Sequence, residues 1–180
     1  MICESYYWKR DLLRRAQKLQ KHLGQKLWSE ASLANLEQTL MLRFYSVRKL
    51  HEARKLSTLT MKQQIVLRSH PCRKMPVTKL NWHNLDELYD LDKKKKENRG
   101  LSFICNQMIH SFIFSPNFDE FRHLEGVYFA SEKQRHKSLL YVSIEGIASL
   151  FELVGNDYPS SAQYTWNPET NDYDVEATNE

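Results

Sequence analysis

The chain has 180 residues, 41% hydrophobic and 27% charged, with a mean hydropathy of −0.63. This composition excludes a wholly disordered chain and argues against a membrane protein, and the length suits one domain. Charge divides the chain, because residues 1–99 carry 22 Lys and Arg against 10 Asp and Glu, whereas residues 100–180 carry 4 against 12. A basic half of this size predicts binding to phosphates, to an acidic partner or to the chain's own acidic half.

The N-terminus and the cysteines indicate the compartment and the chemistry. The stretch MICESYYWKRDLLRR lacks the basic start, apolar centre and small-residue cleavage site of a secretory signal. No apolar run approaches the roughly 20 residues of a membrane-spanning helix. Three cysteines without a CxxC pair predict neither a disulfide framework nor a zinc site. We therefore expect a cytoplasmic protein with no metal, no cofactor and no membrane partner.

Two amphipathic helices are predicted at the start of the chain. Over residues 6–26 the apolar residues recur every three or four positions, which places them on one helical stripe. A second such stripe begins near Ser29 or Ser32, either of which can cap a helix, and continues to about Leu56. Because neither helix can bury its stripe alone, we expect a long antiparallel helical hairpin over residues 5–57.

The polar face of the first predicted helix is basic. Cations there follow one another at spacings of four, four and three residues, so they form a line along the helix. A phosphate backbone or an acidic protein groove could lie on such a line, and the alternative is a solvated helix face. The predicted binding residues are Trp8, Arg10, Arg14, Arg15, Lys18 and Lys21, with Lys9 on the same basic face.

The middle of the chain predicts a strand or loop followed by helices. Residues 58–80 contain the β-prone stretch Gln64–Arg68 and two prolines that forbid a long helix. Residues 81–114 read as helices, interrupted by a solvated turn at Lys93–Lys96. The run Leu101–Phe114 is apolar on more than one side, so we expect it to be a central buried helix.

The remaining residues predict a small β-hairpin, a short helix and a tail. Gly126–Ala130 and Ser138–Ser143 read as two strands around a polar turn, and a short amphipathic helix follows them. Residues 116–157 are expected to pack on the core of a helical domain over residues 1–115. Residues 158–180 are expected to form an acidic, mostly irregular tail. The predicted fold class is α+β, mainly α.

A polar pair interrupts the apolar run at residues 101–114. Asn106 and His110 are four residues apart, so they share one face of a helix. In one interpretation they are core groups that bond to neighbouring helices. In the other, His110 takes the proton of a ribose 2′-hydroxyl, Asn106 orients it, and Arg48 or Arg99 offsets the phosphate charge.

Two long helices followed by a helix with the stretch CNQMIHS resemble the HEPN group of prokaryotic ribonucleases and toxins. The resemblance implies a helical fold over about residues 5–115 and a homodimer. It also implies RNA cleavage without a metal, carried by Asn106 and His110, in defence or toxin–antitoxin systems. The arginine of the family motif is not at its place, and Arg99 lies too far upstream to supply it.

The function expected from these observations is that of a non-catalytic interaction module. It would be a small accessory subunit of a prokaryotic antiviral-defence complex, with a larger protein partner or a second copy of itself. Its basic N-terminal helices would contact RNA, DNA or an acidic protein. The alternative is a HEPN-like, metal-independent endoribonuclease or toxin that uses His110.

Overall fold

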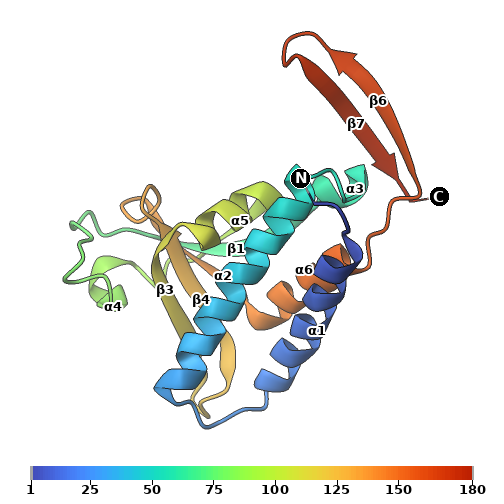
Figure 1. Cartoon of the computed structure of the whole chain (residues 1–180). Helices are drawn as coiled ribbons and strands as arrows, with labels where there is room; N and C mark the ends of the chain where they lie inside the picture. The colour runs from blue at the N-terminus through green and yellow to red at the C-terminus, as the bar shows by residue number, and fades with distance from the viewer. Residues whose placement is uncertain (1, 180) are drawn as a thin grey trace.

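A five-stranded antiparallel sheet forms the centre of the chain in a computed structural model, which describes residues 2–179 (Figure 1). The strand order is β2-β1-β5-β4-β3. Pairing of β4 with β5 confirms the predicted β-hairpin, and β1 confirms the β-prone stretch. The strands are β1 (Gln64–Pro71), β2 (Lys95–Gly100), β3 (Ser111–Phe118), β4 (Leu124–Ser131) and β5 (Ser138–Ser143).

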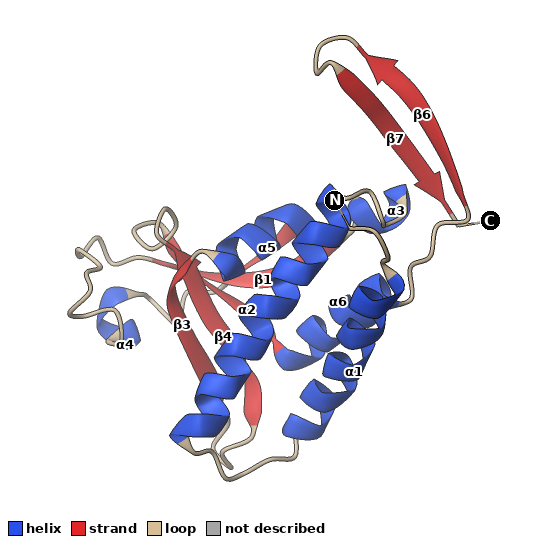
Figure 2. Ribbon diagram, viewed as in Figure 1, coloured by secondary structure: helices blue, strands red, loops and turns tan. Residues whose placement is uncertain are grey.

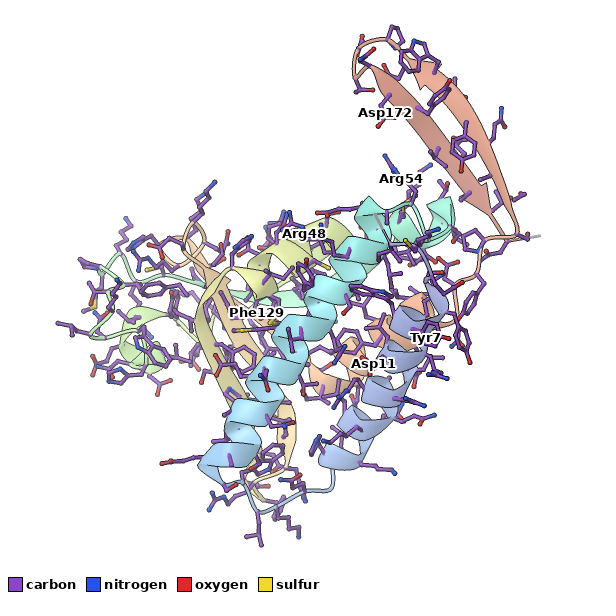
Figure 3. All side chains as sticks on the ribbon, in the orientation of Figure 1. Tyr7, Asp11, Arg48, Arg54, Phe129 and Asp172 are labelled. Carbon is purple, nitrogen blue, oxygen red and sulfur yellow. The ribbon has the colours of Figure 1, made fainter. Side chains whose placement is uncertain are left out.

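Four helices cover one face of this sheet (Figure 2). Their apolar side chains and those of the inner sheet face form one buried cluster, with Phe44 of α2 edge-on to Phe151 of α6. Phe129 of β4 lies in this cluster, between the sheet and the helices (Figure 3). The helices are α1 (Tyr6–His22), α2 (Glu30–Glu52), α5 (Leu101–Ile109) and α6 (Ile144–Gly155), and two single-turn helices are α3 (Thr58–Met61) and α4 (Leu85–Leu88).

The prediction of a mainly helical fold built on a helical hairpin is wrong. Helix α1 packs mainly against α6, and α2 packs mainly against α5, so the two N-terminal helices are not each other's principal partners. The sheet and the later helices together offer a larger apolar surface than one amphipathic helix does, and both stripes are buried there. A largely helical HEPN-like fold is therefore not present.

The second helix begins where the sequence predicted. The Ser29 hydroxyl accepts a hydrogen bond from the Ser32 N–H at 3.2 Å, and the Ser32 hydroxyl accepts one from the Ser29 N–H at 2.7 Å. This reciprocal pair is a capping box, which satisfies two backbone donors at once. Local hydrogen bonding of this kind depends only on neighbouring residues, so the sequence alone reveals it.

The central helix is shorter than predicted, and its flanks are strands. Helix α5 ends at Ile109, and Ser111–Phe118 is β3, an edge strand that contains Pro116. The opposite edge is β2, which includes the lysines expected in a turn. Proline and lysine are typical of edge strands, because they discourage pairing with other chains. Of the helix expected after Asn81, only the single turn of α4 is present.

Part of the second sheet face is covered by the connection between β1 and β2. Val77, Leu88 and Tyr89 of this connection pack against Ile113 and Leu139 on the sheet. Leu139 packs on this second face, whereas Leu140, the next residue of β5, packs in the cluster on the helical side. Successive strand residues point to opposite faces in this way. The sheet is thus buried on both sides near these residues.

The acidic tail is regular rather than irregular. Strands β6 (Ser161–Asn167) and β7 (Asp172–Thr178) form a separate antiparallel hairpin that extends away from the body, and we call residues 161–178 the arm (Figure 1). Its strands are held by cross-strand aromatic contacts, with the rings of Trp166 and Tyr173 5.1 Å apart. The Ala177 N–H donates to the Thr58 hydroxyl at 3.0 Å, which fixes the base of the arm to α3.

Lys9 lies on the buried side of α1 and not on its basic face as predicted. Its side chain is 1% exposed, and its Nζ donates to the carbonyl oxygens of Lys55, at 2.7 Å, and Asp157. The ammonium also lies 4.4 Å from the centre of the Tyr158 ring. Burial lowers the pKa of Lys9, and the nearby Asp157 carboxylate counters this shift. Lys9 thereby joins α1 to the ends of α2 and α6.

Candidate functional site

The exposed side of α1 carries a line of four cations, which we call the cationic ridge. It lies on the side opposite the buried residues Leu12, Ala16 and Leu19. Within residues 2–179, none of the four makes an ion pair with a carboxylate. Their charges are therefore available to a ligand. The ridge consists of Arg10, Arg14, Lys18 and Lys21.

Two tyrosines form the N-terminal end of the cationic ridge. The Arg10 guanidinium lies 5.1 Å from the ring centre of Tyr6 and 5.4 Å from that of Tyr7. Tyr6 is 46% exposed and Tyr7 62%, and Figure 3 shows Tyr7 on the first turn of α1. A cation held over exposed aromatic rings can pair with a phosphate while the rings stack on a base.

Two of the predicted binding residues, Trp8 and Arg15, are engaged in contacts within the protein and are not part of the free ridge. Trp8 is half-buried against the core and lines a groove between α1, the end of α2 and the arm. Arg15 lies 3.9 Å from the Asp11 carboxylate, which also pairs with Arg43 of α2. Trp8 thus takes part in the packing of α1, and Arg15 pairs with an acid of its own helix, so the free ridge is narrower than the six residues predicted.

The three residues predicted for catalysis line one surface cavity. Arg48, Asn106 and His110 border a hollow of about 590 Å³, together with Gln107 and Lys133. His110 is the exposed C-terminal cap of α5, and Asn106 is exposed on the last turns of that helix. The interpretation of this pair as buried core groups is wrong, because α5 ends at Ile109 and turns the imidazole outward.

Within residues 2–179, the side chains of Asn106 and His110 make no hydrogen bond to each other, and the predicted cations are held elsewhere. The Arg48 Nε donates to the Glu52 carboxylate at 2.6 Å. Arg99 donates to the Glu97 carboxylate at 2.9 Å while it lies over Phe103. The cavity therefore has an imidazole and an amide, but its arginine is paired with Glu52, a carboxylate that it shares with Lys49.

The other five residues of the cavity lining were not predicted as site residues: Phe103, Gln107, Ser131, Glu132 and Lys133. Lys133 comes from the turn between β4 and β5, and Gln107 accepts a hydrogen bond from the Ser131 N–H at 3.1 Å. These contacts bring the end of β4 beside α5. The polar turn was visible in the sequence, but its position beside α5 follows from the sheet order and not from any local pattern.

A row of side chains crosses the outer sheet face in register. Arg68 lies over the Tyr141 ring at 5.2 Å, and the rings of Tyr141 and Tyr128 are 5.1 Å apart. A Cβ on Gly126 would lie 2.6 Å from the Tyr141 ring, so glycine is needed for this packing. Tyr141 is only 6% exposed, and the row is therefore a packed layer and not an open stacking surface.

Within residues 2–179, no three His, Cys, Asp or Glu side chains gather as metal ligands would. None of the helices described is long and apolar enough to cross a membrane. Comparisons with protein-family models, with curated proteins and with solved structures find no match to this chain. Functional inference therefore depends on the surfaces themselves.

Proposed function

We propose that this protein is a non-catalytic module that binds the backbone of a nucleic acid through the cationic ridge of α1. The observation that carries the proposal is the line of four cations that have no carboxylate partner among residues 2–179, ending at two exposed tyrosines beside Arg10. Phosphate contacts supply most of the affinity of sequence-independent binding. Adjacent aromatic rings favour single-stranded nucleic acid, whose bases are free to stack.

The anchoring of α1 supports this proposal. Lys9 ties the first turns of α1 to two backbone carbonyls, and the apolar side of the helix packs on α6. The ridge is therefore held in place before a ligand arrives, so binding costs little backbone ordering. A role in a defence complex was expected only together with the helical fold, which the five-stranded sheet replaces.

Binding of fluorescently labelled single-stranded RNA and DNA, followed by anisotropy, tests the proposal. The variant Arg10→Ala, Arg14→Ala, Lys18→Ala, Lys21→Ala should bind more than about tenfold more weakly than the natural chain. A matched control replaces four exposed lysines far from the ridge in sequence: Lys62, Lys79, Lys95 and Lys137. Equal weakening by both variants, or no binding by the natural chain, would contradict the proposal.

The cavity at the end of α5 favours a second candidate function, the cleavage of RNA without a metal. The observation that favours it is the meeting of His110, Asn106 and Lys133 around one hollow of about 590 Å³. An accessible imidazole there can accept a proton, and a lysine can offset phosphate charge. Loss of RNA cleavage in His110→Ala but not in the exposed-turn control His136→Ala would support it, provided both variants stay folded. No cleavage by the natural chain would end it.

A further inference from the structure

The arm has one aromatic face and one acidic face. Successive residues of a strand point to opposite sides, so Tyr164, Trp166 and Tyr173 share one face through the pairing of β6 with β7. The other face of β7 carries a row of three carboxylates, which we call the acidic row. Residues 158–180 contain five Asp and Glu and no Lys or Arg. The acidic row consists of Asp172, Asp174 and Glu176.

The two faces of the arm look in different directions. Tyr164 and Tyr173 line a groove of about 710 Å³ whose opposite wall includes Ile2 and Trp8 of the body. The aromatic face is therefore turned toward the body. The acidic row is on the other side, except that Asp172, at the far end of the arm, also borders the groove (Figure 3).

Within residues 2–179, the acidic row forms no ion pair, although Asp172 borders the same groove as Lys49 and Arg54. Both edges of the two-stranded arm are also unpaired, and a lone hairpin is marginally stable in water. Such an element gains stability when a second surface covers it.

The acidic row and the cationic ridge match in spacing. Alternate residues of a strand are about 6.6 Å apart, so the three carboxylates repeat at that interval along β7. Residues four apart on a helix are about 6 Å apart, which is the interval from Arg10 to Arg14 and from Arg14 to Lys18. Three carboxylates can therefore face three cations along one line.

We propose that the acidic row of one chain docks along the cationic ridge of a second copy, and that two copies exchange arms in this way. Figure 1 shows the arm extending away from the body at the end where α1 begins, while α1 runs from there toward the other end of the body, so the two diverge. The acidic row therefore does not lie along the ridge of its own chain. Because each copy carries both surfaces, a two-fold arrangement satisfies both at once.

This arrangement has a consequence for the ridge, which rests on the proposed function. An arm docked on the ridge presents a row of negative charges where a phosphate backbone would otherwise lie. Nucleic acid must then displace the arm, so the arm acts as a built-in competitor. The dimer itself does not depend on nucleic acid, and it can be tested alone.

Self-association is measured by light scattering after gel filtration, without nucleic acid. The natural chain, of 21.4 kDa, should run at about twice that mass at low ionic strength and as a monomer at about 1 M salt. An arm variant, Asp172→Lys, Asp174→Lys, Glu176→Lys, and a ridge variant, Arg10→Glu, Arg14→Glu, Lys18→Glu, should each be monomeric. Mixed together, the two variants should again give the doubled mass, because their reversed charges complement each other.

Three results would overturn the proposal: a monomeric natural chain at low ionic strength, a dimer that survives both reversals, or a mixture that stays monomeric. The control Lys62→Glu, Lys79→Glu, Lys137→Glu changes the net charge as much as the ridge variant does and should remain dimeric. Because Asp174 accepts a hydrogen bond from Asn167, a second arm variant keeps the side-chain shapes. This neutral arm variant, Asp172→Asn, Asp174→Asn, Glu176→Gln, should also be monomeric.

Competition is read from RNA binding by this neutral arm variant. It should bind RNA more tightly than the natural chain, because its ridge is no longer covered. An unchanged RNA affinity in a variant that has lost the dimer would contradict competition between the arm and nucleic acid for the ridge. If no variant binds RNA, the proposed function fails, while the mass measurement still decides the exchange of arms.

Discussion

Lys9 and Arg10 are neighbours on α1, yet their charges have opposite surroundings. The Lys9 ammonium is enclosed by backbone carbonyls and the Tyr158 ring, whereas Arg10 lies over two exposed tyrosines at the surface. The Lys9 ammonium is satisfied by hydrogen bonds inside the protein, whereas the Arg10 guanidinium is available to a ligand. The number of cations in a helix therefore overstates its capacity to bind anions, since the helical face decides which charges are free.

Replacement of Lys9 should have the largest effect on stability. In Lys9→Met the stem is kept, but the carbonyl oxygens of Lys55 and Asp157 lose their donor while they stay buried. We expect the free energy of unfolding to fall by about 3 kcal/mol, measured by urea denaturation. The control Lys18→Met, on the exposed side of the same helix, should change it by less than about 0.5 kcal/mol. A similar fall in the free energy of unfolding in both variants would contradict a structural role for Lys9 that Lys18 does not have.

Acidification tests a second buried basic group, His70, which is 3% exposed and edge-on to Tyr128. Burial lowers the pKa of His70 below its ordinary value of 6.5, and hydrogen bonds with the backbone of Leu91 and Asp90 counter only part of this shift. The unfolded chain then binds more protons than the folded one, so stability is full above about pH 6.5 and is lost as the pH falls below it. The loss can reach about 1.4 kcal/mol per pH unit.

The measurement is the free energy of unfolding at several pH values for the natural chain and for His70→Gln. The variant should have a shallower pH dependence, whatever its absolute stability. Some dependence should remain, because burial and the nearby Arg54 also lower the pKa of His51. An unchanged slope in the variant would contradict a neutral, buried His70.

The smallest effect on stability is expected on the ridge itself. Arg14→Ala removes an exposed cation that pairs with no carboxylate of the described part of the chain, so the free energy of unfolding should change by less than about 0.5 kcal/mol. Its RNA affinity should nevertheless fall by a similar factor for all sequences, because a phosphate contact carries no base preference. A marked loss of thermal stability, or a loss confined to one sequence, would contradict this assignment.

Elements defined by local chemistry were predictable from the sequence. The start of α2 at Ser29 and the whole of α6 follow from capping residues and from apolar residues at helical spacing. The strands β2, β3, β6 and β7 were missed. The charged segment of β2 shows no apolar alternation, and β3 was assigned in part to the preceding helix. The apolar residues of β6 and β7 do alternate, but these strands lie in a tail whose acidic composition predicted irregular structure. Lys95–Gly100 becomes a strand only because β1 is beside it, and such pairing cannot be read from one segment.

The candidate sites divide in the same way. The spacing of Arg10, Arg14 and Lys18 follows from helix geometry alone, and the structure keeps these cations on one exposed face. The exposure of His110 could not be predicted, because the end of α5 is set by the pairing of β3 with β4. Lys133 joins that cavity through the sheet order, which local sequence does not encode.

The dependence of RNA binding on salt tests the central claim most directly. Four cations that neutralise phosphates of a single strand should give a slope of about −2.8 in the logarithm of the association constant against the logarithm of salt concentration. Loss of all four ridge cations should bring this slope close to zero, whereas the control without Lys62, Lys79, Lys95 and Lys137 should keep it. A slope near zero for the natural chain, or one that the ridge variant shares with it, would contradict the claim that the exposed face of α1 binds the phosphate backbone.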